Sequence, residues 1–388
     1  MSNITLNLTD KPSMRKTVLF FLIIITGFSF VVKAQSDIDL SAKDTVYKKQ
    51  ITAFPYPAYA QETSWEFGVL SVFQFKMPDA TFGTRPSNAT FIGFYTLENQ
   101  LRLKLEHTIF TKNEDWLFEG TWEHSKYPEK YYGIGSNSSA DDEQLVDWSK
   151  IDFRQQILKK LSDKMFLGVQ LRYANYWDIS LGPKKDGTPG DVTTLPGYEG
   201  GSVSGLGSTY KWDTRDLVLS PSKGFFIEGR FEVYHKYLGS DYDFNVLTLD
   251  LRKYFDLSKE KEGTSVLAFQ GLTKQTFGEL TPFREMALMG GLNMMRGVYE
   301  GRYRDQKMIA AQTEFRQYLF WRIGMTAFLA TANVFDEYGN FTGQDFKIAG
   351  GGGLRFLINK KDKASIRVDY GIGPEKSSGL YLTFGEAF

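Results

Sequence analysis

Residues 101–106 read Leu-Arg-Leu-Lys-Leu-Glu, an unbroken alternation of apolar and charged side chains. In a β-strand successive side chains point to opposite faces, so one face of this segment is apolar and the other is charged. The same two-residue period recurs from Trp65 to the end of the chain and is clear at 227–233, 247–252 and 366–370. The pattern predicts an all-β protein.

The length of the alternating runs separates two β architectures. A soluble sandwich also alternates, but its strands are usually about 5–6 residues long. Here the runs last about ten residues or more, the length that a tilted strand needs to cross a lipid bilayer. A charged inner face then means a hydrated lumen, and closure into a barrel gives every backbone group the partner that lipid requires. The sequence therefore predicts a transmembrane antiparallel β-barrel, integral to the outer membrane of a Gram-negative cell.

Bulk composition agrees with a barrel. The 388 residues include 32 Phe, 21 Tyr and 37 Gly, yet the mean hydropathy is −0.32. A helical membrane protein would be clearly apolar, whereas a barrel with one polar face would not be. The 46 basic residues balance the 46 acidic ones, so charge gives no indication of a nucleic-acid partner.

Several kinds of chemistry find no support. The chain has no cysteine, and its three histidines, at positions 107, 124 and 235, do not share a ligand-like spacing. We therefore expect no disulfide, metal site, lipid anchor or cofactor. The glycine run at 350–353 lacks the Lys-Ser/Thr of a phosphate-binding loop, so we attribute it to strand curvature or to a close approach of the backbone. The lumen wall explains the alternating acidic residues, and we expect no catalytic residue and no enzyme activity.

The N-terminal residues have the order of a secretory signal. Residues 14–16 are Met-Arg-Lys, and an apolar run follows at 17–32. This run is too short and wrongly flanked for a typical transmembrane helix, although a retained anchor is the alternative. We expect a signal peptide at 1–34, a Pro- and Tyr-rich periplasmic linker at 35–63 and the barrel at 64–388.

The alternation predicts sixteen strands, an even number as bacterial barrels need. They are 64–75, 87–97, 100–111, 114–124, 149–161, 164–177, 202–213, 224–237, 241–256, 263–274, 284–289, 307–320, 322–335, 345–358, 364–373 and 379–388. With the N-terminus in the periplasm, the long connections 125–148 and 178–201 fall on the periplasmic side, where turns are usually short. This conflict points to a split or missed strand between 112 and 201.

Four segments stand out from the alternation. The first is the last strand with its aromatic end, and its marked residues are Gly379, Leu380, Leu382, Phe384, Gly385 and Phe388. The second is a loop that follows two glycines and contains Arg296, Gly297 and Tyr299. An arginine in a lumen screened from water can form charge-assisted bonds with a wall carboxylate, and Glu314 points inward by parity.

The other two segments read as structural. A turn is expected between two mid-barrel strands, where Asp213 and Arg215 can pair locally. Its marked residues are Asp213, Arg215, Asp216, Pro221 and Gly224. The fourth segment is the glycine run, which leads to Arg-Val-Asp-Tyr-Gly at 367–371.

Together the four segments resemble the BamA/TamA outer-membrane assembly superfamily, also called the bacterial surface-antigen family, over about residues 60–388. The resemblance implies that 379–388 is the closing strand and assembly signal, and that the Arg296 loop is the sixth extracellular loop, folded into the lumen against Glu314. The family's second acidic residue and its glycine fall at Ala330 and Ala332 here, so we expect Arg296 to rest on Glu314 alone. The alternative is an ordinary surface loop with a solvated arginine.

The resemblance also implies a function. Members insert other outer-membrane proteins or translocate polypeptides, and they usually carry periplasmic polypeptide-transport-associated (POTRA) domains before the barrel. About thirty residues lie between the expected cleavage site and the first expected strand, so we expect a member without such domains. Its expected partners are outer-membrane lipid, outer-membrane protein substrates, and periplasmic or outer-membrane partner proteins. The alternatives are a passive porin-like channel and a surface-structural barrel that has lost assembly activity.

Overall fold

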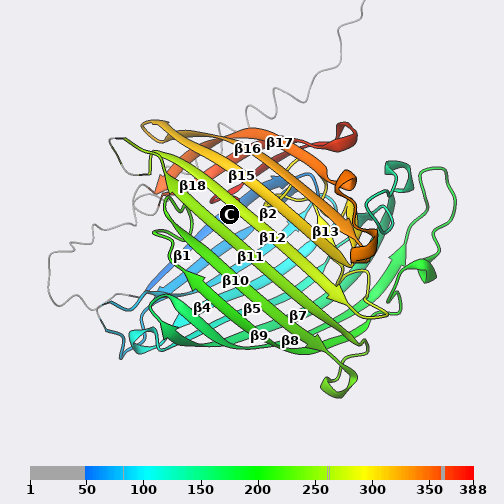
Figure 1. Cartoon of the computed structure of the whole chain (residues 1–388), viewed down its shortest axis with the longest axis horizontal. Helices are drawn as coiled ribbons and strands as arrows, with labels where there is room; N and C mark the ends of the chain where they lie inside the picture. Colours follow the sequence, from blue (N-terminus) through cyan, green and yellow to red (C-terminus); the bar gives the residue numbers. More distant parts are fainter. Residues whose placement is uncertain (1–48, 82, 260, 262, 360–362) are drawn as a thin grey trace, which may run out of the picture. The chain divides into compact units, whose positions relative to one another are not determined.

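The computed structural model describes residues 49–388 except 82, 260, 262 and 360–362. One sheet of 17 strands closes on itself (Figure 1). The three-residue strand β6 (Glu129–Tyr131) only extends one hairpin, which leaves 16 strands in the wall. The expected fold, an all-β antiparallel barrel of sixteen strands, is confirmed. The expected signal peptide at 1–34 lies outside the described residues.

Each wall strand pairs antiparallel with the next wall strand along the chain. In order, the wall strands are β1 (Gln50–Ala60), β2 (Ser64–Phe75), β3 (Ser87–Thr96), β4 (Leu101–Phe110), β5 (Trp116–Lys126), β7 (Gln144–Ser162), β8 (Met165–Leu181), β9 (Gly201–Asp213), β10 (Gly224–Tyr234), β11 (Phe244–Asp256), β12 (Ser265–Phe277), β15 (Lys307–Phe320), β16 (Ile323–Phe335), β17 (Lys347–Asn359), β18 (Ala364–Ile372) and β19 (Ser378–Phe384). The barrel closes where β1 meets β19, a contact we call the seam.

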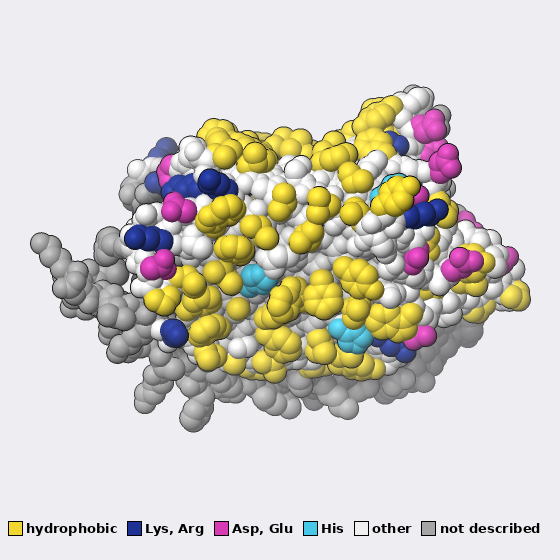
Figure 2. Space-filling model, turned by 90° about the horizontal axis from the view of Figure 1, so that it is seen from below, with side chains coloured by type: hydrophobic (Ala, Val, Ile, Leu, Met, Phe, Trp, Pro, Cys, Tyr) yellow, Lys and Arg dark blue, Asp and Glu magenta, His cyan; other side chains and the backbone are white. Residues whose placement is uncertain are grey.

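The two faces of the wall differ as the alternation requires. In β11 the outward Leu247 and Leu251 are about two-fifths exposed, whereas Asp250 and Arg252 pair with each other inside. Figure 2 shows apolar side chains over the middle of one face of the barrel and charged side chains toward its two ends. An apolar belt between charged rims fits a bilayer. No helix among the described residues is long and apolar enough to span a membrane.

The first wall strand, β1, lies within the segment 35–63 that the sequence analysis predicted to be a periplasmic linker. Residues 50–60 form β1, which pairs with β2 over its whole length, so the prediction that the barrel starts at 64 is wrong. The two prolines in this segment, Pro55 and Pro57, are rare in central strands. They fit here because β1 borders the seam.

One predicted wall strand lies elsewhere. Residues 287–289 form β13 (Ala287–Met289), which pairs with β14 (Tyr303–Asp305) in a separate two-stranded hairpin. The predicted strand at 284–289 is therefore not in the wall, and the count of sixteen survived because one strand was missed and one was added.

Adding β1 also resolves the conflict over the long connections. The long connections 127–143, 182–200 and 278–306 all leave from the same end of the barrel, on the right of Figure 1. Long connections are typical of the extracellular end of an outer-membrane barrel. No wall strand was missed between 112 and 201, where only the three-residue β6 was not predicted.

The closing strand is shorter than expected. β19 ends at Phe384, and Gly385 then adopts a left-handed backbone with φ of 75° that favours glycine. After this turn Phe388 is buried inside the barrel, in a cluster with Tyr254. The prediction of a strand that continues through 388 is wrong.

Candidate functional site in the barrel lumen

The connection 278–306, which we call the lumen loop, packs against the inner wall. Its Met295 and Val298 are fully buried, and they share an apolar cluster with Ala330 and Ala332 of β16. The loop side of this cluster also contains Met289 of β13. Ala330 and Ala332 are the positions where the sequence comparison expected an acid and a glycine. In this chain they are small apolar neighbours of the loop, not charged anchors.

Arg296 sits at the centre of a buried ion cluster. It forms ion pairs with Glu314 of β15 and, at 2.5 Å, with Asp369 of β18, and all three side chains are fully buried. Its guanidinium also lies 3.6 Å from the ring centre of Phe328. The structure thus brings Arg296 and Glu314 together, but the expectation that Glu314 acts alone is wrong. Asp369 supplies the second carboxylate.

The alternation of β18 could have predicted that Asp369 faces the lumen. Parity on β18 turns Arg367 and Asp369 toward the lumen, since both are buried while their neighbours Tyr370 and Ile372 are exposed. The opposing residue on β17 is Gly353, where a side chain would collide with the Asp369 carboxylate. The glycine run therefore makes room for the anchor and is not a ligand cradle.

Further charged residues connect the anchor to the end of the chain. Glu314 also pairs with Arg316 at 2.7 Å, and Asp369 with Arg355 at 2.5 Å. Arg355 in turn binds Glu386 at 2.7 Å. These three residues were not singled out from the sequence, because each belongs to an ordinary alternating strand or to the expected closing strand.

The last three residues complete this cluster. The Arg316 side chain donates a hydrogen bond to the backbone oxygen of Phe388 at 2.8 Å and another to the backbone oxygen of Pro221. The Phe388 ring lies 6.3 Å from that of Tyr254. The end of the chain is thus held in the lumen near the mid-barrel turn, on the side opposite the long loops.

A second ion cluster fastens the start of the lumen loop to the opposite wall. Glu285 pairs with Arg172 of β8 at 2.8 Å, and Arg172 also pairs with Asp152 of β7 at 2.9 Å. The hydroxyl of Tyr176 donates to Glu285 at 2.8 Å. Because Arg172 holds two carboxylates in a fork, this contact fixes the loop in orientation as well as position.

The loop tip also bridges the seam from inside. The backbone N–H of Gly297 donates to the Tyr381 hydroxyl on β19 at 3.1 Å. The N–H of Glu300 donates to the carboxylate of Glu62, in the β1–β2 turn, at 2.9 Å. Burial and the neighbouring carboxylate of Glu300 raise the pKa of Glu62 to about 7. The lumen loop therefore contacts β19 on one side of the seam and the β1–β2 turn on the other.

The return arm of the loop binds the extracellular connections. Arg304 pairs with Glu129 at 3.0 Å, and Arg302 with Glu375 at 2.7 Å. Tyr299, singled out with Arg296, accepts a hydrogen bond from the backbone N–H of Lys130 at 3.0 Å. With these contacts the loop crosses the lumen and is tied to several parts of the wall and its rim.

The seam itself is minimal. β1 and β19 share one ladder pair, Tyr59 with Leu382. By contrast β1 shares eleven pairs with β2, and β18 shares seven with β19. Of the residues marked in the last strand, Gly379 is buried, while Leu380 is 46% exposed on the outer face.

The mid-barrel turn is held by contacts among its own residues. Arg215 and Asp213 pair at 2.8 Å, and Asp216 accepts hydrogen bonds from the backbone of Ser222 and Lys223. Gly224 has φ of 99° and lies where a side chain would strike the backbone of Thr214. Pro221 carries the backbone oxygen that Arg316 binds.

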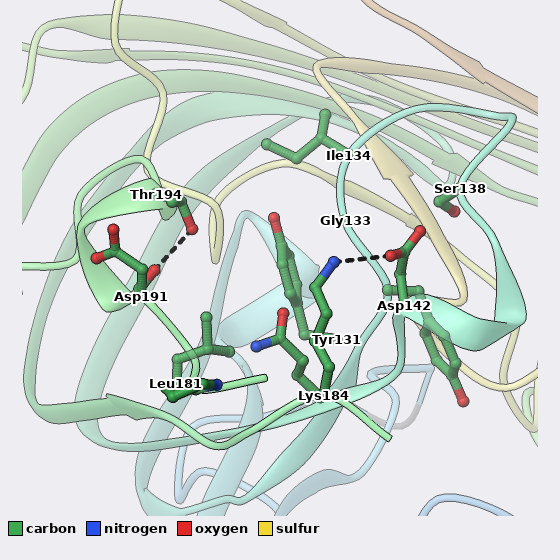
Figure 3. A pocket seen from close by; sticks show the side chains of 12 residues that line it. Tyr131, Gly133, Ile134, Ser138, Asp142, Leu181, Lys184, Asp191 and Thr194 are labelled. Atoms are coloured by element: carbon green, nitrogen blue, oxygen red, sulfur yellow. Dashed lines mark hydrogen bonds and ion pairs between the residues drawn. The ribbon is translucent and has the colours of Figure 1, made fainter. Parts of the chain in front are cut away.

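The connections 127–143 and 182–200 line an open pocket of about 440 Å³ (Figure 3). Lys184 and Asp142 pair across it at 2.9 Å, and Thr194 bonds to the backbone of Asp191. Because these groups already have partners, the cavity does not point to a bound group. Among the described residues there is also no group of three or more His, Cys, Asp or Glu placed to hold a metal ion.

Comparisons with known proteins agree on the fold. A family model described as the Omp85 superfamily domain matches residues 80–388. Among solved structures, BamA from Haemophilus ducreyi lacking POTRA domains 1–3 is similar with a TM-score of 0.58 and 11% identity, covering 87% of this chain and 70% of that one. CdiB from Acinetobacter baumannii gives 0.53 and 10%, covering 87% and 65%, and CdiB from Escherichia coli gives 0.54 and 10%, covering 88% and 68%. At such identities the likeness shows the fold alone, and no curated protein sequence matches the chain.

Proposed function

The chain belongs to the Omp85 superfamily, and we propose that it assembles or inserts outer-membrane proteins, or translocates polypeptides, by opening its seam sideways into the membrane. Periplasmic or outer-membrane partner proteins deliver the substrate in this proposal. In this proposal the role is not enzymatic, because the barrel offers strand edges for hydrogen bonding and makes or breaks no covalent bond in its substrate.

The observation that carries the proposal is that neighbouring wall strands share very different numbers of ladder pairs. One ladder pair joins β1 to β19, whereas every other neighbouring pair of wall strands shares seven or more. Opening at the seam therefore breaks far fewer hydrogen bonds than opening elsewhere. The two edges set free are templates for another strand, because an edge strand presents unpaired N–H and C=O groups.

The lumen loop supports gating in place of passive conduction. It is tied to one wall through Glu285 and Arg172 and to the other through Arg296, and its tip touches both sides of the seam. A porin-like channel needs an open lumen. A loop fastened in this way argues against free passage, and it places the anchor where it can steady the closed seam.

The experiment that tests the proposal is depletion of the protein followed by quantitative proteomics of the outer membrane. Loss of many unrelated barrels would indicate a general assembly role. Loss of one or a few proteins would indicate a dedicated insertase or translocation subunit. An outer membrane of unchanged composition would overturn the proposal and favour a surface-structural barrel.

A further inference from the structure

The β1 edge of the seam has an unusual backbone. β1 pairs with β2 without a break from Gln50 to Ala60, straight through Pro55 and Pro57. Proline has no N–H to donate, and in antiparallel strands the hydrogen-bonding groups of successive residues point alternately to the two sides. An unbroken ladder with β2 therefore requires both prolines, and the other odd-numbered residues of β1, to face the seam.

The same parity explains why the seam is one pair long. Tyr59 is odd-numbered and faces β19, where it pairs with Leu382. Extending this antiparallel register would set Pro57 opposite Phe384 and Pro55 opposite Glu386. Neither proline can donate, so pairing stops after Tyr59. Below that point the rings of Tyr56 and Phe384 stack at 5.7 Å and fill the gap without backbone bonds.

The β19 edge has no such defect. Ser378–Phe384 contains no proline, so each residue that faces the seam has both an N–H and a C=O to offer. By parity with Leu382 these residues include Leu380 and Phe384, and the register gives neither of them a partner on β1 among the described residues. At membrane depth such groups call for a strand partner, because lipid cannot satisfy them.

We propose that β19 is the edge on which an incoming strand pairs, and that Pro55 and Pro57 prevent β1 from closing over that edge or competing for the strand. The inference rests on the proposed function. The occupant is an extended segment of another outer-membrane protein with apolar and polar residues in alternation. This follows from the faces of β19, where Leu380 is exposed on the outer side and Tyr381 is fully buried on the lumen side.

The test uses the full chain folded in phospholipid vesicles, and its lack of cysteine makes cross-linking unambiguous. The probe is a synthetic peptide with the sequence of β18, Ala364–Ile372, which alternates in the required way, carrying Val368→Cys. Two single variants report the edges: Leu380→Cys on β19 and Ala53→Cys on β1. We expect the β19 variant to form the disulfide with the peptide about tenfold more, since each unpaired carbonyl that the peptide would leave at a proline weakens pairing.

Replacing the prolines tests their role directly. In Pro55→Thr/Pro57→Thr the two missing N–H groups return, so β1 can either bind the peptide itself or close over β19. In both cases the excess of cross-linking at Leu380→Cys over that at Ala53→Cys should shrink. The matched control is Ala58→Thr, whose N–H already faces β2, and it should change neither yield. Heat-dependent gel mobility checks that each variant folds.

Two results would overturn the inference: equal cross-linking at both edges in the presence of the prolines, or a ratio of the two yields that does not change in Pro55→Thr/Pro57→Thr. Both results can occur while depletion of the protein still removes other proteins from the outer membrane. Conversely, depletion can leave the outer-membrane proteins unchanged while the two edges still differ in cross-linking. Failure of this inference and failure of the proposed function are therefore separate outcomes.

Discussion

The anchor of the lumen loop makes a quantitative prediction for Arg296→Ala. The substitution removes a fully buried guanidinium and leaves Glu314 and Asp369 buried behind it. Breaking a buried pair by removing one partner typically costs about 3–5 kcal/mol, because the remaining charge is uncompensated. Two carboxylates lose their partner here, but Glu314 keeps Arg316 and Asp369 keeps Arg355. We therefore expect a loss of about 3–5 kcal/mol in total.

The assay is equilibrium unfolding by urea in detergent micelles, with heat-dependent gel mobility as a second readout. Arg302→Ala is the matched control, because it removes the same side chain from the same loop. The carboxylate it leaves unpaired, Glu375, is half exposed, so it should cost only about 1–2 kcal/mol in lost hydrogen bonds. Arg296→Lys should fall between the two, since a lysine cannot fork to both carboxylates.

Charge removal on the wall provides the internal check. Adding Glu314→Gln and Asp369→Asn to Arg296→Ala would leave the buried Arg316 and Arg355 with Glu386 as their only carboxylate, so the triple variant should be less stable than Arg296→Ala. Equal unfolding free energies for Arg296→Ala and Arg302→Ala would refute the reasoning. So would a triple variant that is as stable as Arg296→Ala or more stable than it.

Three further predictions concern the loop and the end of the chain. Burial raises the folded pKa of Glu62 from 4.5 to about 7, so the folded state gains most from the neutral carboxyl below pH 4.5 and loses that gain as pH rises through 7. The thermal midpoint should therefore fall between about pH 4.5 and 7.5, and Glu62→Gln should reduce that fall, whereas Glu98→Gln in the neighbouring turn should not. In planar bilayers the intact protein should be nearly silent and deletion of 292–305 should give steady conductance, whereas an intact protein that already conducts would contradict a filled lumen. Phe388→Ala should lower stability by about 3–5 kcal/mol as buried aromatic truncations do, and an unchanged urea midpoint would show that the inward position of Phe388 contributes nothing.

The sequence predicted the barrel because alternation is a local property. A period of two over ten residues needs no knowledge of neighbours, so strands such as β15 (Lys307–Phe320) were placed to the residue. β1 was missed for the opposite reason. Its prolines count against a strand in any local reading, and only the position beside the seam makes them acceptable.

The anchor could be predicted only in part. Parity was enough to turn Glu314 inward, and the motif placed Arg296 in the lumen. Asp369 lies three wall strands from Glu314, so nothing in a linear reading joins the two carboxylates. Glu386 was hidden by the assumption that alternation continues to residue 388, when a single left-handed glycine at 385 turns the chain into the lumen.

The central claim is that the seam opens during function, and locking it tests that claim most directly. Tyr59 and Leu382 form the ladder pair, and such pairs stand about 5.5 Å apart between Cα atoms, within disulfide range. In cells whose only copy is Tyr59→Cys/Leu382→Cys, we predict that oxidation depletes the same outer-membrane proteins as loss of the protein does, and that reductant restores them. The matched lock, Ala53→Cys/Ser71→Cys within the fully paired β1–β2 ladder, should have no effect. An oxidised seam lock that maintains a normal outer membrane would contradict the account.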